Sequence, residues 1–321
     1  MVTSVSPHAQ TMRTLVVGLC VWLVILVATL ASWTRLSLIE LLFLLAPWIL
    51  VPCELALLGP FGSTSRRQFQ HTRWIQFFAI PATASLMIHF RPASAALAAC
   101  WLCVCAAVAA DGVFRIARFR ATSFAQFCVS AGEVYLLVGR IWLVMSRLGW
   151  HPAGFEEPIV FLTAIHFHFA GFMSALLAAF TYNRLEARAA RILRVFLTGA
   201  VIGPGILGLA FLAGPKWKLL AVVLIFAGQC GLAAGTALLG FRTLPSLSGV
   251  CFLLASSSLT LGMLFALAWA IGEYPLHPWI DLARMERIHG VLNALGFGLM
   301  TVIGWAFLTQ GIPARESQSC A

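Results

Sequence analysis

Residues 158–182 read PIVFLTAIHFHFAGFMSALLAAFTY, an apolar stretch with two histidines and without a lysine, arginine, aspartate or glutamate. A helix needs about 20 such residues to cross the hydrocarbon core of a bilayer. We therefore predict a membrane-spanning helix that carries His166 and His168 inside it. Lipid offers no water to solvate an imidazole, so an ionisable group within a span is by default a candidate functional residue.

The composition extends this prediction to the whole chain. Of its 321 residues, 61% are hydrophobic and 10% are charged, whereas a soluble domain carries about 25% charged residues. We expect an all-α polytopic bundle that forms one integral-membrane domain over residues 1–321, with the lipid bilayer as its first partner. The net charge of +10 does not indicate nucleic-acid binding, because its arginines sit in short gaps between apolar runs.

Ten apolar spans can be drawn, or nine if the short third span or the tenth, which begins with charged residues, is left out. They cover residues 14–33, 36–58, 74–90, 93–110, 126–148, 158–180, 192–213, 218–240, 246–272 and 286–309. With the N-terminus inside, 13 basic residues fall in inside segments and seven in outside segments. This bias predicts that both termini are cytoplasmic.

Proline and glycine positions predict breaks in two spans. Pro47 and Pro52 are expected to interrupt the second span, and Gly203-Pro204-Gly205 the seventh. Such breaks free backbone carbonyls, which is tolerated where protein or a cavity satisfies them. The Gly199-x-x-x-Gly203 and Gly231-x-x-x-Gly235 pairs predict close helix packing in the seventh and eighth spans.

His166 and His168 form the first candidate site, and they are two residues apart. Two residues turn a regular helix by about 200°, so both rings can face one ligand only if the helix is locally distorted. The functional roles open to them are metal or haem ligand, proton carrier and general acid or base. The competing structural role is an interhelical hydrogen bond that fixes packing. Two histidines so close together favour a functional role.

The second candidate site lies in residues 285–294, MERIHGVLNA. His289 and Asn293 are four residues apart and share a helix face, and Glu286 precedes His289 by three residues. Glu286 is more simply explained as part of a solvated helix start. On the predicted topology the sixth and tenth spans both begin outside. The histidines of both sites and Asn293 are therefore expected in the outer half of the membrane.

Embedded acids supply the third group of candidates. Glu40 and Glu54 lie in the second span, and Glu133 lies in the fifth, seven residues before Arg140. That spacing is about 10 Å along a helix, which is too long for a direct ion pair. A buried carboxyl group can donate a proton to a substrate, or it can be a protonated acid bonded to a backbone carbonyl. We take Glu54 and Glu133 as the candidate proton donors.

The sequence HFHFAGF at 166–172, together with HGVLNALGF at 289–297, resembles the YndJ-like family of polytopic bacterial membrane proteins. The resemblance covers residues 155–310, and the first half of the chain agrees mainly in hydrophobicity. It implies a multi-span bundle in the bacterial cytoplasmic membrane, with His166, His168, His289 and Asn293 as signature positions. It brings no biochemical activity.

Three functions fit these residues, and we favour a membrane-embedded enzyme that acts on an isoprenoid or other lipid. Its histidines and a protonated carboxyl group would supply acid–base chemistry, such as a proton-initiated cyclisation or isomerisation. The alternatives are a proton-coupled transporter of a small molecule and a metal- or haem-binding protein built on His166 or His168 with His289. The enzyme is favoured because the polar groups cluster on two spans at one depth. The sequence indicates no particular cofactor.

Overall fold

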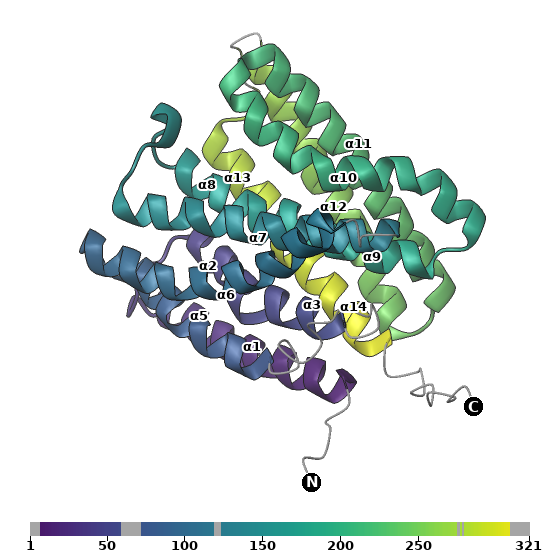
Figure 1. The fold of residues 1–321 in the computed structure, drawn as a ribbon, viewed down its shortest axis with the longest axis horizontal. Coiled ribbons are helices and arrows are strands. Elements are labelled where there is room, and N and C mark those ends of the chain that lie inside the picture. Colours follow the sequence, from purple (N-terminus) through teal and green to yellow (C-terminus); the bar gives the residue numbers. More distant parts are fainter. Residues whose placement is uncertain (1–6, 59–71, 119–122, 275–276, 278, 309–321) are drawn as a thin grey trace.

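The computed structural model describes residues 7–58, 72–118, 123–274, 277 and 279–308, and all regular structure within them is helical (Figure 1). Nine helical stretches of this part of the chain are long and apolar enough to cross a bilayer, and α5 is a shorter apolar helix. The predicted all-α polytopic bundle is confirmed, with about ten spans.

Six of the spans are single helices, together with the shorter α5. They are α1 (Pro7–Leu30), α5 (Thr72–Met87), α6 (Arg91–Ala117), α7 (Phe124–Leu148), α10 (Ala187–Ala213), α11 (Pro215–Thr243) and α12 (Leu247–Glu273). Three spans are divided by a wider π-helical segment. They are α2 (Leu38–Leu45), η1 (Ala46–Leu50) and α3 (Val51–Leu57); α8 (Ile159–His166), η4 (Phe167–Met173) and α9 (Ser174–Arg184); and α13 (Leu282–Val291), η5 (Leu292–Leu299) and α14 (Met300–Leu308).

The short helix α5 crosses the same layer as the longer ones. Near its start, Gln76 donates hydrogen bonds to the carbonyls of Thr14 in α1 and Trp48 in η1, at 2.9 and 2.8 Å. At its end, the carbonyl of Ser85 accepts a hydrogen bond from Ser94 of α6 at 2.6 Å. Ten crossings place the start of α1 and the end of α14 on one face of the bundle, where these two helices contact each other (Figure 1).

The two faces of the bundle differ in their exposed side chains. One face, here called the tryptophan face, carries Trp33, Trp150, Trp217 and Trp279 on or beside the links between helices, each more than half exposed. Tryptophan collects at membrane–water interfaces. The opposite arginine face carries exposed arginines at the α9–α10 and α11–α12 links, namely Arg184, Arg188, Arg191 and Arg242. Because 13 basic residues fall in the inside segments of the predicted topology and seven in the outside segments, we predict that the arginine face is cytoplasmic.

The three divided spans lie at the centre of the bundle, with α1 and α5 on one side and α10 and α11 on the other (Figure 1). Their π-helical segments contact one another. The second span is the most enclosed, with 83% of its most apolar stretch buried. Pro47 and Pro52 do not interrupt it, since the helix passes Pro47 through the widened turn of η1. The predicted interruption at Gly203-Pro204-Gly205 is wrong, because α10 continues through Pro204.

Small residues bring α10 and α11 into close contact. Gly228 of α11 lies directly against the backbone of Gly199 and Ala200 in α10, so a Cβ atom at Gly228 would overlap the Ala200 nitrogen. A Cβ atom at Gly199 would lie 3.5 Å from the Gly228 Cα, which is ordinary van der Waals contact. The contact therefore tolerates a methyl group on one helix but not on the other.

Gly228→Ala should lower the thermal unfolding midpoint of the detergent-purified protein, because overpacking a tight contact costs about 1–3 kcal/mol. Gly199→Ala adds the same methyl group to the facing helix and should leave the midpoint near that of the wild type. Equal losses for the two variants, measured side by side by thermal denaturation, would contradict this packing of α10 against α11.

Candidate functional site

A cavity of about 260 Å³ lies between the divided spans and α10, α11 and α12. We call it the His166 cavity. Most of its lining is apolar, and its aromatic side chains come from four different elements. Its polar lining residues are Thr163, His166, Ser174, Lys218, Gln229, Glu286, His289 and Asn293. An apolar cavity with a few convergent polar groups is the usual form of a small-molecule site.

The cavity occupies the half of the bundle next to the tryptophan face. Along α11 its lining runs from Lys218, in the first turn, to Gln229 near the middle of the helix. Eleven residues of helix correspond to about 16 Å, roughly half of a hydrocarbon core. At the mouth, Lys218 forms an ion pair with Glu273 of α12 at 2.7 Å. The structure thus places His166, His289 and Asn293 in the same half of the bundle, as the sequence predicts.

His166 lines this cavity and has a ring nitrogen without a partner among the described residues. It is the last residue of α8, immediately before the helix widens into η4. Its Nε2 atom is buried and has no hydrogen-bond partner among the described residues. The ring lies edge-on to Phe167, with 5.7 Å between ring centroids. A buried polar nitrogen without a partner costs free energy, and a ligand group could satisfy it.

In His289, by contrast, both ring nitrogens have a hydrogen-bond partner. Its Nδ1 lies 2.8 Å from the carbonyl oxygen of Gly262 in α12. A carbonyl only accepts, so Nδ1 carries the proton and Nε2 is the acceptor. The Asn293 amide nitrogen lies 2.9 Å from Nε2 and 3.1 Å from Nδ1, and with Nδ1 protonated it can donate only to Nε2. This contact confirms that His289 and Asn293 share a helix face. The Asn293 Oδ1 is buried and has no partner among the described side and main chains.

His168 points away from the cavity. Its Nδ1 donates to the carbonyl of Ala164 at 2.8 Å, and its ring packs edge-on against Phe43 at 5.1 Å between centroids. It lies against Gly139 of α7, where a side chain would leave no room for the ring. The sequence predicts that a local distortion is needed to bring both histidines to one ligand. A distortion is present in η4, yet the two rings still diverge.

The structure does not bring Glu54 or Glu133 to the His166 cavity. Glu54 in α3 is fully buried, and neither carboxylate oxygen has a hydrogen-bond partner among the described residues. Glu133 in α7 forms an ion pair with Arg115 of α6, whose Nε also donates to Ser130 at 3.0 Å. Arg140, which the sequence places on the same helix face as Glu133, instead donates two hydrogen bonds to the Ala98 carbonyl.

Two cavity residues were not predicted as site residues. Glu286 supplies the one carboxyl group among the lining residues, whereas its position in the sequence suggests that it belongs to a solvated helix start. Its three-residue spacing from His289 was the available signal. Gln229 is 2% exposed, and its Oε1 has no hydrogen-bond partner in the described part of the chain. A lone amide in the middle of an apolar span was the signal for it.

The same side chains include the groups that could bind a metal ion or haem. In the described ranges, no three His, Cys, Asp or Glu side chains are placed to hold one metal ion. Of the two histidines that line the cavity, only His166 offers a free nitrogen, because both nitrogens of His289 are engaged.

A family model for YndJ-like proteins matches residues 41–297, which extends the resemblance well into the first half of the chain. The uncharacterized membrane protein YndJ of Bacillus subtilis (strain 168) is 25% identical over 178 residues. The matched stretch covers 54% of this chain and 31% of that protein, so the chain spans less than a third of this curated relative. No solved structure matches the chain.

The Arg115–Glu133 pair generates a stability prediction. Glu133→Leu and Arg115→Met should each lower the unfolding free energy by about 3 kcal/mol, because each leaves one charge of a largely buried pair without its partner. The double variant Arg115→Met/Glu133→Leu should recover most of that loss. The measurement is denaturant or thermal unfolding of all four proteins in the same detergent. Additive losses in the double variant would show that the two side chains do not act as a pair.

Proposed function

Because the chain belongs to the YndJ-like family, whose Bacillus subtilis relative is uncharacterized, we propose its function from the geometry of the His166 cavity. We propose that the protein is a membrane-embedded enzyme that performs acid–base chemistry on an apolar, lipid-like substrate. The observation that carries this proposal is the buried, unpartnered Nε2 of His166 in a cavity whose lining is mostly apolar.

The lining supports an apolar substrate with a small polar end. A volume of about 260 Å³ is near the lower limit of ligand pockets, which range over about 300–1,000 Å³. Phe167, Phe169, Phe211, Trp269 and Phe297 contribute aromatic side chains to the lining. The faces of such rings attract a positive charge. This arrangement suits a hydrocarbon substrate, such as an isoprenoid, that becomes cationic when it is protonated.

His166 and Glu286 are the proposed proton-transfer residues. Both line the cavity, and none of the ion pairs among the described residues includes Glu286. One of them would donate a proton to a double bond, and the other would remove a proton from a neighbouring carbon. Such an isomerisation or cyclisation balances without an oxidant or a reductant. Asn293, whose amide nitrogen is held by His289 and whose Oδ1 has no partner among the described residues, would position the polar end of the substrate.

The depth of the cavity supports an enzyme rather than a transporter. On α11 the lining ends at Gln229, and beyond it Gly231 and Gly235 pack closely against Phe196 of α10 and Thr181 of α9. A transporter needs a binding site that can open to both sides of the membrane. The described helices are instead packed closely on one side of this cavity, as expected for a reaction chamber that admits its substrate from one half of the bilayer.

Heavy water provides a test that can be made with a mixture of natural lipids. The purified full chain is incubated in heavy water with lipids extracted from the membranes in which it was expressed, and the lipids are analysed by mass spectrometry. Wild type should introduce one deuterium into a specific lipid. His166→Gln should reduce this rate by about 10²–10⁴-fold, the usual contribution of a general acid or base.

Two substitutions on α12 distinguish the loss of substrate binding in the cavity from a general effect of adding a phenylalanine to this helix. Ala266 lines the cavity, whereas Leu264 is 47% exposed on the outside of the same helix. Ala266→Phe should abolish labelling by filling the cavity, and Leu264→Phe should label like the wild type. The absence of labelling by wild-type protein, or unchanged labelling by His166→Gln, would overturn the proposal.

A further inference from the structure

A second pocket, of about 470 Å³, opens on the tryptophan face between the α1–α2 link, the α5–α6 link and the end of α7. We call it the Arg91 pocket, and its polar lining includes Arg35, Glu40, His89, Arg91, Ser94 and Arg147. It is separate from the His166 cavity, because α2 lies between them. Ile39 and Leu42 line the His166 cavity, whereas Glu40 lines the Arg91 pocket.

The Arg91 pocket concentrates positive charge. Three arginines line it, and Glu40 is the one carboxylate among its lining residues. Within the described chain, neither Arg35 nor Arg91 forms an ion pair. Exposed Trp33 lines the same pocket, which places it at the level where tryptophan marks the membrane interface.

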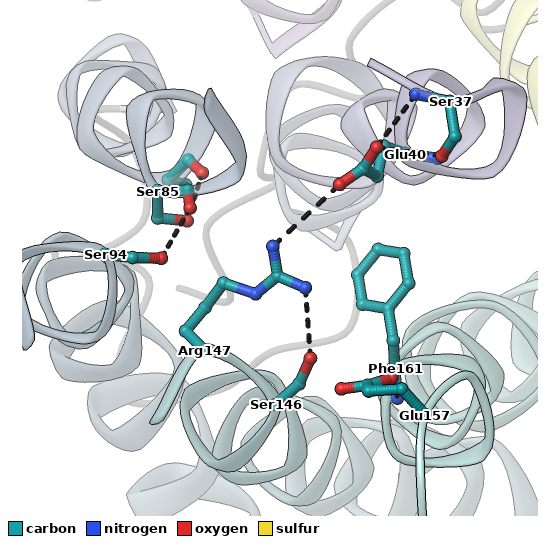
Figure 2. A network of polar contacts seen from close by, with 9 residues as sticks. Ser37, Glu40, Ser85, Ser94, Ser146, Arg147, Glu157 and Phe161 are labelled. Carbon is teal, nitrogen blue, oxygen red and sulfur yellow. Dashed lines mark hydrogen bonds and ion pairs between the residues drawn. The ribbon is translucent and has the colours of Figure 1, made fainter. Parts of the chain in front are cut away.

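Arg147 lies at the inner wall of the pocket, and one of its guanidinium nitrogens has no hydrogen-bond partner among the described residues. Figure 2 shows its guanidinium group between Glu40 and Ser146. Its Nη1 lies 3.9 Å from a Glu40 carboxylate oxygen, and its Nη2 donates to Ser146 at 3.1 Å. The guanidinium carbon lies 5.3 Å from the ring centroid of Phe161. Its Nε atom is buried and has no partner among the described residues.

Arg91 is positioned by backbone rather than by an acid. Its guanidinium group packs on Gly149, which ends α7 in the left-handed conformation, with φ of 68°. A Cβ atom at Gly149 would overlap that group, so the glycine both closes the helix and makes room for the arginine. The charge of Arg91 is thus directed to the pocket without a carboxylate beside it.

Glu40 offsets only one of the three arginine charges, and its carboxylate is held at the start of α2. Its Oε2 atom accepts hydrogen bonds from the backbone nitrogen and the hydroxyl of Ser37, both at 2.8 Å (Figure 2). The bond from the Ser37 backbone nitrogen, together with the bond from the Glu40 backbone nitrogen to the Ser37 hydroxyl oxygen at 3.2 Å, forms the capping box that starts α2. The other oxygen faces Arg147 at the long distance of 3.9 Å. The pocket therefore retains a net positive charge.

We infer that the Arg91 pocket binds a phosphate-bearing group. Guanidinium groups match the geometry and charge of phosphate and bind it through paired hydrogen bonds. Arg35 and Arg91 supply unpaired guanidinium groups at the rim, and Arg147 adds a positive charge at the wall. The phosphate could belong to a lipid headgroup or to a free phosphate ion, since both can reach an interfacial pocket. This inference does not depend on the proposed function.

The test titrates two probes, inorganic phosphate and water-soluble dihexanoyl phosphatidic acid, into the full chain purified in an uncharged detergent. Arg35→Gln and Arg91→Gln should each weaken binding by about 10–100-fold, the effect of losing a hydrogen bond to a charged group. Arg284→Gln is the matched control, because Arg284 is exposed near the same face but lies outside the pocket. Its binding should equal that of the wild type.

Glu40→Gln supplies a prediction of the opposite sign. Glutamine can still accept the capping hydrogen bonds of Ser37, so α2 should keep its start while the pocket loses its carboxylate. Phosphate binding should tighten by about fivefold, which corresponds to removing a repulsion of about 1 kcal/mol. Unfolding midpoints near the wild-type value establish that all four variants are folded.

The two probes distinguish the source of the phosphate. Binding of inorganic phosphate with the predicted pattern of variants supports a site for the free ion. Binding of phosphatidic acid alone, with the same pattern, supports a headgroup site. Absence of binding by both probes would overturn the inference. Equal binding by wild type, Arg35→Gln and Arg91→Gln would overturn it as well.

Discussion

Three widened helical turns contact one another at the centre of the bundle, and two of them line the His166 cavity. The segments η1, η4 and η5 belong to the three divided spans and touch one another. A π-helical turn holds one more residue than an α-helical turn, so it changes the direction of the side chains that follow. Segment η4 begins directly after His166, and η5 begins three residues after His289. The irregular backbone is enclosed by other helices, which is the condition for tolerating it at membrane depth.

Buried polar atoms without a partner among the described residues occur in several parts of the bundle, and three of them belong to residues that line the His166 cavity. The His289 ring exchanges hydrogen bonds with Gly262 and Asn293, while His166 Nε2, Gln229 Oε1 and Asn293 Oδ1 have no partners among the described residues. Each unpaired buried group costs about 1–3 kcal/mol. All three residues line one cavity. A ligand with a polar end could recover that free energy at the cavity, whereas Glu54, His168 and Arg147 carry unpaired buried atoms that lie outside it.

Hydropathy and helix periodicity were enough to predict the bundle and the His289–Asn293 contact, because both depend on residues close in sequence. The choice between His166 and His168 was not predictable, since it depends on how η4 packs against Phe43 and Gly139. Arg115 lies 18 residues before Glu133, so their pairing also required tertiary structure. Pro204 was misleading for a further reason. A proline removes one backbone donor, and neighbouring helices can hold the rest of the helix straight.

Glu40 links the fold of the chain to the charge of the Arg91 pocket. A capping box needs a side chain at the third helical position that accepts a hydrogen bond. Glutamate and glutamine can both accept it. Helix formation therefore does not require a negative charge at this position. The carboxylate instead holds Arg147 in place at long range and lowers the positive potential of the pocket. An acid retained among three arginines moderates phosphate affinity, so that a bound headgroup or ion can also leave.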